Sequence, residues 1–277
     1  MNFKNIQFIF NRALSLTFNK KKLLLVFLIL LLCGVLAVFF RGLAINAGQW
    51  FVLSLAFLPI FLCCGVLLAT GILLIRIYHN EVKNKDISYK DIVTNSWDTI
   101  LGSAYLTIPI ILSYLLLWML LGIFFLLNEL PGVGTFFGVI LAFAPFLINL
   151  GSLILCVLSL SMLFFITPIV ALKGLNGVQI SQTLTRRFQQ DLFFNLLLAA
   201  IATLPLLLIV SLLTAAAALT GAICYTCDYP LYVTLQWFFV MIPFTALLTP
   251  AVVFFFNFAA EAHVLLQKQA LNNSSQT

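Results

Sequence analysis

The side chains best suited to acid–base or metal chemistry are few, and two of them are the histidines His79 and His263. They lie in the polar segments RIYHNE and AEAHVL, each beside a long apolar run. A protein metal site needs about three or four ligands in a defined array, and nothing in these segments supplies them. We therefore expect both histidines to be interfacial side chains, and we expect no metal ligands in the chain.

A second candidate for chemistry is the motif CYTC, formed by Cys224 and Cys227. A Cys-x-x-Cys pair can be redox-active, supply half of a metal site or close a local disulfide. No second cysteine pair, neighbouring histidine or thioredoxin-like context accompanies it. The residues leave a structural disulfide, a redox pair and two free thiols as alternatives. The other four cysteines lie in apolar runs and should behave as small apolar side chains.

The remaining polar candidates do not form a catalytic pattern. Glu129, in LLNELPG, could bind a cation or a lipid head group, although an acid in that place more often simply ends an apolar run. Asn149 is explained by hydrogen bonding between helices. GVGTFFG lacks the Lys and Ser/Thr of a P-loop, and no serine has a G-x-S-x-G context. We therefore predict no catalytic residue, no cofactor and no enzymatic activity.

The composition fixes the environment of the chain. Of 277 residues, 63% are apolar and 8% are charged, and the mean hydropathy is +1.16. Soluble proteins average roughly 45–50% apolar and about 25% charged residues. So few charges cannot cover the surface of a water-soluble protein of 30.9 kDa. Soluble enzymes, nucleic-acid modules and disordered regulators are excluded, and an integral membrane protein is predicted.

Six apolar runs are long enough to span a bilayer, which takes about 20 residues. The predicted spans are Leu23–Phe40, Phe51–Ile75, Ile100–Leu127, Val139–Phe165, Leu192–Leu219 and Leu231–Phe255. The runs are apolar all round, whereas barrel strands alternate in polarity. An all-α polytopic bundle is therefore expected. The uncharged stretch 130–172 could hold two tight spans, but we predict one long tilted helix.

Charge placement supports six spans with both termini in the cytoplasm. That topology puts 13 of the 14 basic residues inside and leaves only Arg41 outside, as the positive-inside rule requires. A seventh span before Lys173 would reverse this for Lys173, Arg186 and Arg187. We predict a multi-pass protein of the bacterial inner membrane.

The same charges indicate membrane lipids, anionic on the cytoplasmic side, as the partners. The candidate head-group contacts are Lys20, Lys21, Lys22, Arg186 and Arg187. Nucleic acid is not expected as a partner, and a protein partner is unknown.

Three similar segments lead into alternate spans. Ile6, Ile92 and Val178 come into register at offsets of 86 and 86 residues, and each begins an amphipathic stretch of about 15 residues. Such stretches are typical of helices that lie in the membrane interface. The predicted unit is an interfacial helix followed by a hairpin of two spans. The repeats cover about 1–85, 86–172 and 173–265 of one membrane domain, 1–265, with a polar tail over 266–277.

The segment Ile166–Leu198, ITPIVALKGLNGVQISQTLTRRFQQDLFFNLLL, resembles a junction in six-span inner-membrane proteins. These include the membrane domain of some glycerophosphodiester phosphodiesterases and its stand-alone relatives of unknown function. In that junction a span ends at a Pro and a small-residue turn, and a basic amphipathic helix, an aromatic residue and the next span follow. The matching residues here are Pro168, Gly174, Gly177, Ser181, Arg186, Arg187, Phe188 and Phe193.

The resemblance has two departures. Relatives often carry an acidic residue near the turn, where this chain has Lys173. The spans use up the chain, so we expect no phosphodiesterase catalytic domain and carry over no such activity.

These observations favour a non-enzymatic membrane protein in lipid handling or envelope maintenance. Parallel repeats occur in transporters, so a small-solute or lipid transporter is an alternative, although duplicated hairpins also simply make stable bundles. The charged segment 76–98 leaves a membrane subunit with a soluble partner as a third class.

Overall fold

The computed structural model describes residues 3–44, 49–84, 89–128, 134–190, 192–219 and 230–274, and all regular structure in these ranges is helical. The elements are α1 (Phe3–Ser15), α2 (Lys20–Ala44), α3 (Gln49–Val82), α4 (Tyr89–Ala104), a 3-10 turn η1 (Tyr105–Thr107), α5 (Ile108–Asn128), α6 (Gly134–Lys173), α7 (Gly177–Gln190), α8 (Leu192–Leu219) and α9 (Pro230–Ser274). The predicted all-α fold class is confirmed.

A short helix followed by two long ones occurs three times in this order, as α1–α2–α3, α4–α5–α6 and α7–α8–α9. Within the described ranges, six helical stretches are long and apolar enough to cross a membrane. The stretch that could have held two spans is one continuous helix of 40 residues, α6. The hairpin prediction is therefore confirmed, while the division into domains and a tail stays a prediction.

The turns after α3 and α6 each contain a residue with a positive φ. Gly174 follows α6 with a φ of +85°, and its N–H donates to the carbonyl of Val170 at 3.0 Å. Asn84 follows α3 with a φ of +50°, and its N–H donates to the carbonyl of Glu81 at 3.0 Å. Gly and Asn tolerate this left-handed conformation best, so both helices end where such a residue occurs.

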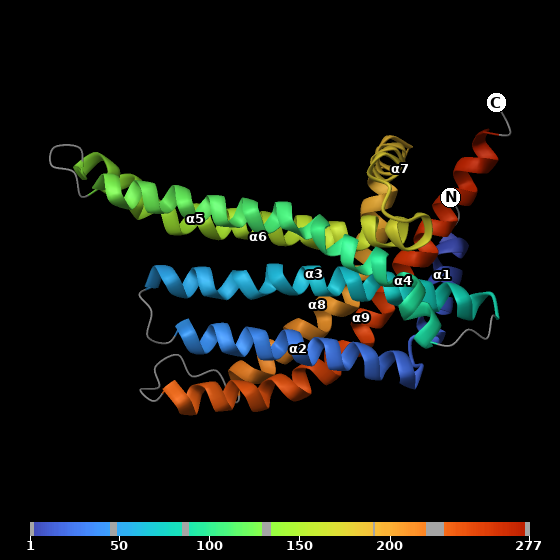
Figure 1. Ribbon diagram of the computed structural model, residues 1–277, viewed down its shortest axis with the longest axis horizontal. Coiled ribbons are helices and arrows are strands. Elements are labelled where there is room, and N and C mark those ends of the chain that lie inside the picture. Colours follow the sequence, from blue (N-terminus) through green and yellow to red (C-terminus); the bar gives the residue numbers. More distant parts are fainter. Residues whose placement is uncertain are drawn as a thin grey trace.

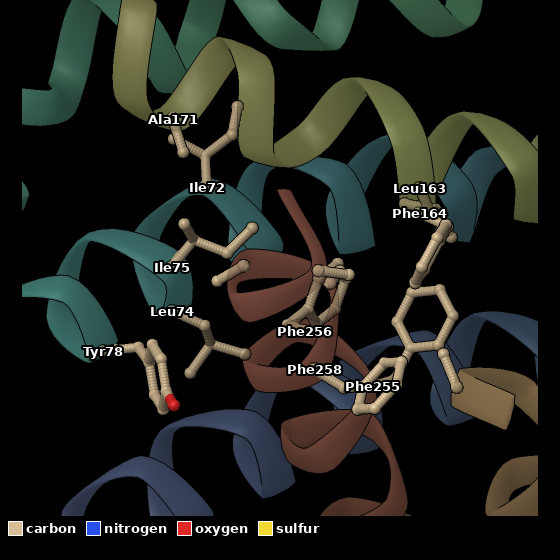
Figure 2. Packing of buried hydrophobic residues seen from close by; sticks show 14 of the residues in the cluster. Ile72, Leu74, Ile75, Tyr78, Leu163, Phe164, Ala171, Phe255, Phe256 and Phe258 are labelled. Carbon is tan, nitrogen blue, oxygen red and sulfur yellow. The ribbon is translucent and has the colours of Figure 1, made fainter. Parts of the chain in front are cut away.

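The second span of each hairpin is an inner helix. In the spans of α3, α6 and α9, 56%, 50% and 44% of the most apolar stretch is buried, against 17%, 11% and 11% for α2, α5 and α8. Figure 2 shows the core where the inner helices meet, with Ile72 and Ile75 on α3, Leu163 on α6, and Phe255 and Phe256 on α9. At Gly71 on α3 the approach is so close that an added Cβ would overlap the ring of Phe256.

The three short helices lie together at one end of the bundle, with the C-terminal turns of α9 (Figure 1). We call this the basic end, because Arg12, Lys22, Arg76, Lys173 and Arg187 belong to the elements that meet there. The opposite end is called the far end.

Apolar side chains on the short helices also face away from the bundle. Phe8 on α1, Trp97 on α4 and Val178 on α7 are 64%, 54% and 66% exposed. Exposed apolar side chains on amphipathic helices are suited to a membrane interface.

Toward the far end the hairpins separate. α5 packs on α6 and α3, while α8 packs on α9 and α7. Figure 1 shows the α5–α6 hairpin extending away from the rest of the bundle at its far end. Exposed apolar side chains such as Phe146, Leu153 and Val157 cover this part of α6. Such a surface is suited to lipid.

Candidate functional site at the basic end

A charge-balanced cluster joins the first and the last repeat at the basic end. The carboxylate of Glu261 on α9 accepts a hydrogen bond from the Tyr78 hydroxyl on α3 at 2.8 Å. The same Glu261 oxygen lies 3.5 Å from a guanidinium nitrogen of Arg12 on α1. Beside these contacts the rings of Phe10 and Phe254 meet edge to face, 5.1 Å apart. These contacts hold the interfacial helix α1 against α9.

The other half of this cluster is the pair of Lys22 on α2 and Glu81 on α3. Lys22 is 0% exposed, and its ammonium lies 5.3 Å from the centre of the Tyr78 ring. The side-chain amide of Asn19 donates to Glu81 at 2.8 Å. Two basic and two acidic side chains thus balance one another, as buried charges generally must.

Arg76 fastens the second short helix. Its guanidinium donates to the carbonyl of Ala171 on α6 at 3.0 Å. It also donates to the hydroxyls of Ser96 and Thr99 on α4, at 2.6 and 3.2 Å. Neutral oxygens therefore satisfy this partly buried cation, and the contacts tie α3, α4 and α6 together.

The third short helix brings positive charge against the bundle without a matching acid. Arg187 on α7 is 8% exposed, and no carboxylate in the described ranges pairs with it. Its backbone carbonyl accepts a hydrogen bond from the Asn195 amide at 2.7 Å. Burial lowers the pKa of Arg187 to about 10, which leaves the guanidinium charged at neutral pH.

His263 on α9 is also buried inside the bundle. It is 0% exposed, and neither ring nitrogen has a hydrogen-bond partner in the described part of the chain. Arg187 and the exposed Lys173 both act electrostatically on its ring. The Lys173 ammonium lies 3.3 Å from the hydroxyl of Thr183 on α7. We call Lys173, Arg187 and His263 the α7 cluster.

Sequence reasoning missed these clusters, although a signal for them was present. Each inner helix carries a buried polar side chain six residues before a basic or imidazole side chain near its end. The pairs are Thr70 and Arg76, Thr167 and Lys173, and Asn257 and His263. A polar side chain spaced in this way on three equivalent helices indicates an internal site rather than the end of an apolar run.

The residues predicted to contact lipid head groups differ in their exposure. Lys20 and Lys21 are exposed at the start of α2, as a head-group contact requires. Lys22 is buried and paired with Glu81, so its predicted contact with a head group is corrected. Arg187 is likewise buried rather than displayed on the outer face of α7. The side chain of Arg186 lies outside the described residues.

The remaining candidates from the sequence are the two histidines, the cysteine pair and Glu129. His263 is wholly buried, because α9 continues beyond its predicted span and carries the ring into the bundle; its interfacial position stays a prediction. His79 is partly exposed near the end of α3. Cys224, Cys227 and Glu129 lie outside the described residues, so the three alternatives for the cysteine pair stay predictions.

An apolar groove lies between α8 and α9 on the far-end side. Its volume is about 670 Å³. The lining residues are Leu213, Ala216, Ala217, Tyr232, Leu235, Gln236, Phe239, Val240, Pro243 and Phe244. Gln236 is the one amide among them, and its side-chain oxygen is buried without a partner in the described ranges. On the neighbouring α2, the Arg41 guanidinium lies 5.4 Å from the Trp237 ring centre.

These features allow binding chemistry. In the part of the chain that the structure describes, no three His, Cys, Asp or Glu side chains come together as a metal would require. What is present is a charged region at one end of the helices and an apolar groove toward the other. That combination matches amphipathic ligands, which have one charged and one apolar part.

The chain matches no known family, no curated protein and no solved structure. The structural class of the protein is therefore assigned from its helices alone. It is a multi-pass, all-helical membrane protein built from three hairpins, each preceded by a short amphipathic helix.

Proposed function

We propose that the protein is a non-enzymatic lipid-handling protein of the bacterial inner membrane, and that the α8–α9 groove takes a lipid acyl chain. The groove carries this proposal. Its volume of about 670 Å³ lies within the roughly 300–1,000 Å³ of pockets that hold small ligands. It opens between two apolar spans, where the surrounding medium is hydrocarbon, and nine of its ten lining residues lack a charged or amide side chain.

Gln236 supplies the polar contact of the groove. An amide in hydrocarbon is costly unless it is hydrogen-bonded, and its buried oxygen accepts only from a donor such as a lipid hydroxyl or ammonium. Arg41, near the same end of α9, adds a positive charge that suits a lipid phosphate. A lipid with its chain in the groove would thus meet polar groups of both kinds.

The basic end supports the proposed orientation. Basic side chains gather there on several helices, while Arg41 is the basic residue of the last turn of α2. A basic end is retained in the cytoplasm during insertion, so both termini are proposed to be cytoplasmic. The turn at Gly174 also supports the proposed resemblance to the lipid-related membrane domain, because that junction has a small-residue turn at this place.

A matched pair of variants tests the lipid role. Ala217 lines the groove, and Ala217→Trp should fill it. Native mass spectrometry of the purified variant should then show less bound lipid than that of the wild type. Ala215, on the same helix, is exposed and does not line the groove, so Ala215→Trp should bind as much lipid as the wild type. If the two variants retain the same lipids in the same amounts, the groove is not a lipid site.

A lipid transporter is the second candidate, and the separation of the hairpins toward the far end favours it (Figure 1). In that case the reconstituted protein should move labelled lipid between the leaflets of a vesicle, and Ala217→Trp should stop the movement. Binding without movement favours handling over transport. A stoichiometric soluble protein in the purified sample would instead favour the third class, a membrane subunit.

A further inference from the structure

We propose that the lipid of the α8–α9 groove is a glycerophospholipid of the leaflet at the far end, with its phosphate at Arg41 and a hydrogen-bond-donating head group at Gln236. This inference rests on the function proposed for the groove and adds the class of the lipid and the leaflet that supplies it. The donor is the ammonium of an ethanolamine head group or the hydroxyl of a glycerol head group, because both offer a hydrogen to the same amide oxygen.

The first argument is the depth of Arg41 in the membrane. Arg41 lies in the last turn of α2, and Lys20 is the first residue of that helix. At about 1.5 Å per residue, the helix between them is about 32 Å long, close to the roughly 30 Å of a hydrocarbon core. Lys20 is exposed at the basic end, so Arg41 reaches the head-group layer of the opposite leaflet. That layer holds the lipid phosphates.

The second argument is that α9 brings Arg41 to the edge of the groove. The Arg41 guanidinium lies over the ring of Trp237, 5.4 Å from its centre. Trp237 stands three and seven residues before Val240 and Phe244, a spacing that puts the three side chains on one side of the helix. Val240 and Phe244 line the groove. Trp237 therefore forms the border between the groove and α2.

This border offers donors to a phosphate. The Nε–H of Arg41 and the indole N–H of Trp237 are buried without an acceptor in the described ranges. Buried donors in proteins are nearly always hydrogen-bonded, so the place favours an acceptor supplied by a ligand. A guanidinium that stacks on an aromatic ring keeps the N–H groups of its edge for two oxygens of a phosphate.

Gln236 sets the requirement for a donor on the lipid. It lines the groove directly before Trp237, and its side-chain oxygen is buried without a partner in the described part of the chain. An ethanolamine ammonium or a glycerol hydroxyl donates to such an oxygen, whereas a choline ammonium has no N–H. A buried acceptor left unmatched lowers the affinity by about tenfold or more. The groove should therefore select against choline.

The length of the groove fits one leaflet. Its lining runs along α9 from Tyr232 to Phe244. At about 1.5 Å per residue this stretch is about 18 Å long, and one leaflet contributes about 15 Å of hydrocarbon. The end of α2 and the start of α9 both lie at the far end (Figure 1). The head group therefore lies at that end, and the acyl chain extends toward the middle of the bilayer.

The test is native mass spectrometry of the full chain in detergent, with lipids that carry the same acyl chains. The probes are phosphatidylethanolamine, phosphatidylglycerol, phosphatidylcholine and diacylglycerol. Lipid that is lost in Ala217→Trp but kept in Ala215→Trp counts as groove-bound, so head-group contacts elsewhere cancel. We expect groove-bound phosphatidylethanolamine, phosphatidylglycerol or both to exceed phosphatidylcholine by about tenfold, and the preferred lipid identifies the donor. Phosphatidylglycerol should likewise exceed diacylglycerol, which keeps a hydroxyl but lacks the phosphate.

Variants assign each preference to its residue. Gln236→Leu should bring the ratios of both donor lipids to phosphatidylcholine close to one, while groove-bound lipid persists. Arg41→Gln should abolish the preference for phosphatidylglycerol over diacylglycerol. Lys83→Gln removes an exposed charge at the basic end and should keep that preference. A wild-type groove that holds all four lipids equally, or unchanged ratios in Gln236→Leu, would overturn the inference and leave the acyl-chain site intact.

A series of head groups keeps the inference testable if Gln236→Leu folds poorly. Monomethyl and dimethyl phosphatidylethanolamine keep the zwitterion and at least one N–H, so the wild-type groove should retain them and lose affinity only with choline. A steady decline from the first methyl group would indicate steric exclusion and overturn the role of Gln236. Equal lipid in Ala217→Trp and Ala215→Trp would instead remove the groove site and with it the function proposed above, so the two failures are distinguishable.

Discussion

The ammonium of Lys22, wholly buried at the start of α2, pairs with the carboxylate of Glu81 at the end of α3 and faces the ring of Tyr78. The pair joins the two helices of the first hairpin at their basic ends. Its burial makes the two side chains depend on each other, because either one alone would be a charge away from water.

Breaking the Lys22–Glu81 pair should therefore destabilise the protein strongly. Glu81→Gln leaves Lys22 buried without its counter-charge, and such changes cost about 3–5 kcal/mol. The double variant Lys22→Met with Glu81→Leu removes both charges and should recover most of that loss. The unfolding midpoint in detergent measures both effects, and Lys20→Met, at an exposed position, serves as the control. A double variant no more stable than Glu81→Gln would contradict this account.

Gly71 should tolerate no side chain where α3 crosses α9. A methyl group there would overlap the ring of Phe256, and overpacking of this kind costs about 1–3 kcal/mol. Gly122 on α5 has no other atom within 4 Å of an added Cβ, so Gly122→Ala should be neutral or slightly stabilising. Comparing the unfolding midpoints of Gly71→Ala and Gly122→Ala separates crowding from helix propensity. Equal midpoints would argue against close contact of α3 with α9.

The six-span topology predicts which sites face which compartment. Reporter fusions after Lys173 and Lys268 should report the cytoplasm, and fusions near Gly48, Gly132 and Asp228 should report the other side. The reason is that an even number of spans separates residues of the first group from the N-terminus. A cytoplasmic signal at Asp228 would contradict the topology, whatever the other sites report.

Lys20 and Lys21 should give the protein a preference for anionic lipid. Each basic residue near an anionic surface contributes about 1 kcal/mol, and both side chains are exposed at the start of α2. Replacing both with Gln should lower the ratio of phosphatidylglycerol to phosphatidylcholine retained by the protein, as counted by native mass spectrometry. Replacing both with Arg keeps the charge and should preserve that ratio. An unchanged ratio in the Gln variant would assign the preference to other residues.

The sequence was informative about the helices and much less so about their partners. Runs such as Leu23–Phe40 must bury backbone polar groups in hydrocarbon, and only a helix does so within one segment. Lys22 begins the same run, and its charge alone indicated a lipid contact. Whether Lys22 faces lipid or Glu81 depends on where α3 ends and how α1 packs, and local periodicity does not contain that information.

The α7 cluster shows the same limit of local reasoning. His263 stands eight residues beyond the predicted span that ended at Phe255, and its polar neighbours suggested a surface position. In the fold, α9 continues as one helix to Ser274, and the His263 ring is wholly buried inside the bundle. The α8–α9 groove likewise arises from the packing of two helices whose lining residues are apolar apart from Gln236.

The packing of α2 against α9 has a consequence for how the protein is made. The first span forms the most extensive helix contact in the described fold with the last one, and α9 also supplies the Phe254–Phe258 portion of the core. A ribosome delivers α9 only after the other spans have entered the bilayer. Until then, the apolar surfaces of α2 and α3 that α9 will cover stay open to the lipid. Assembly is thus completed by the final helix, and a chain released before about residue 250 would be inserted yet unassembled, a natural substrate for membrane proteases.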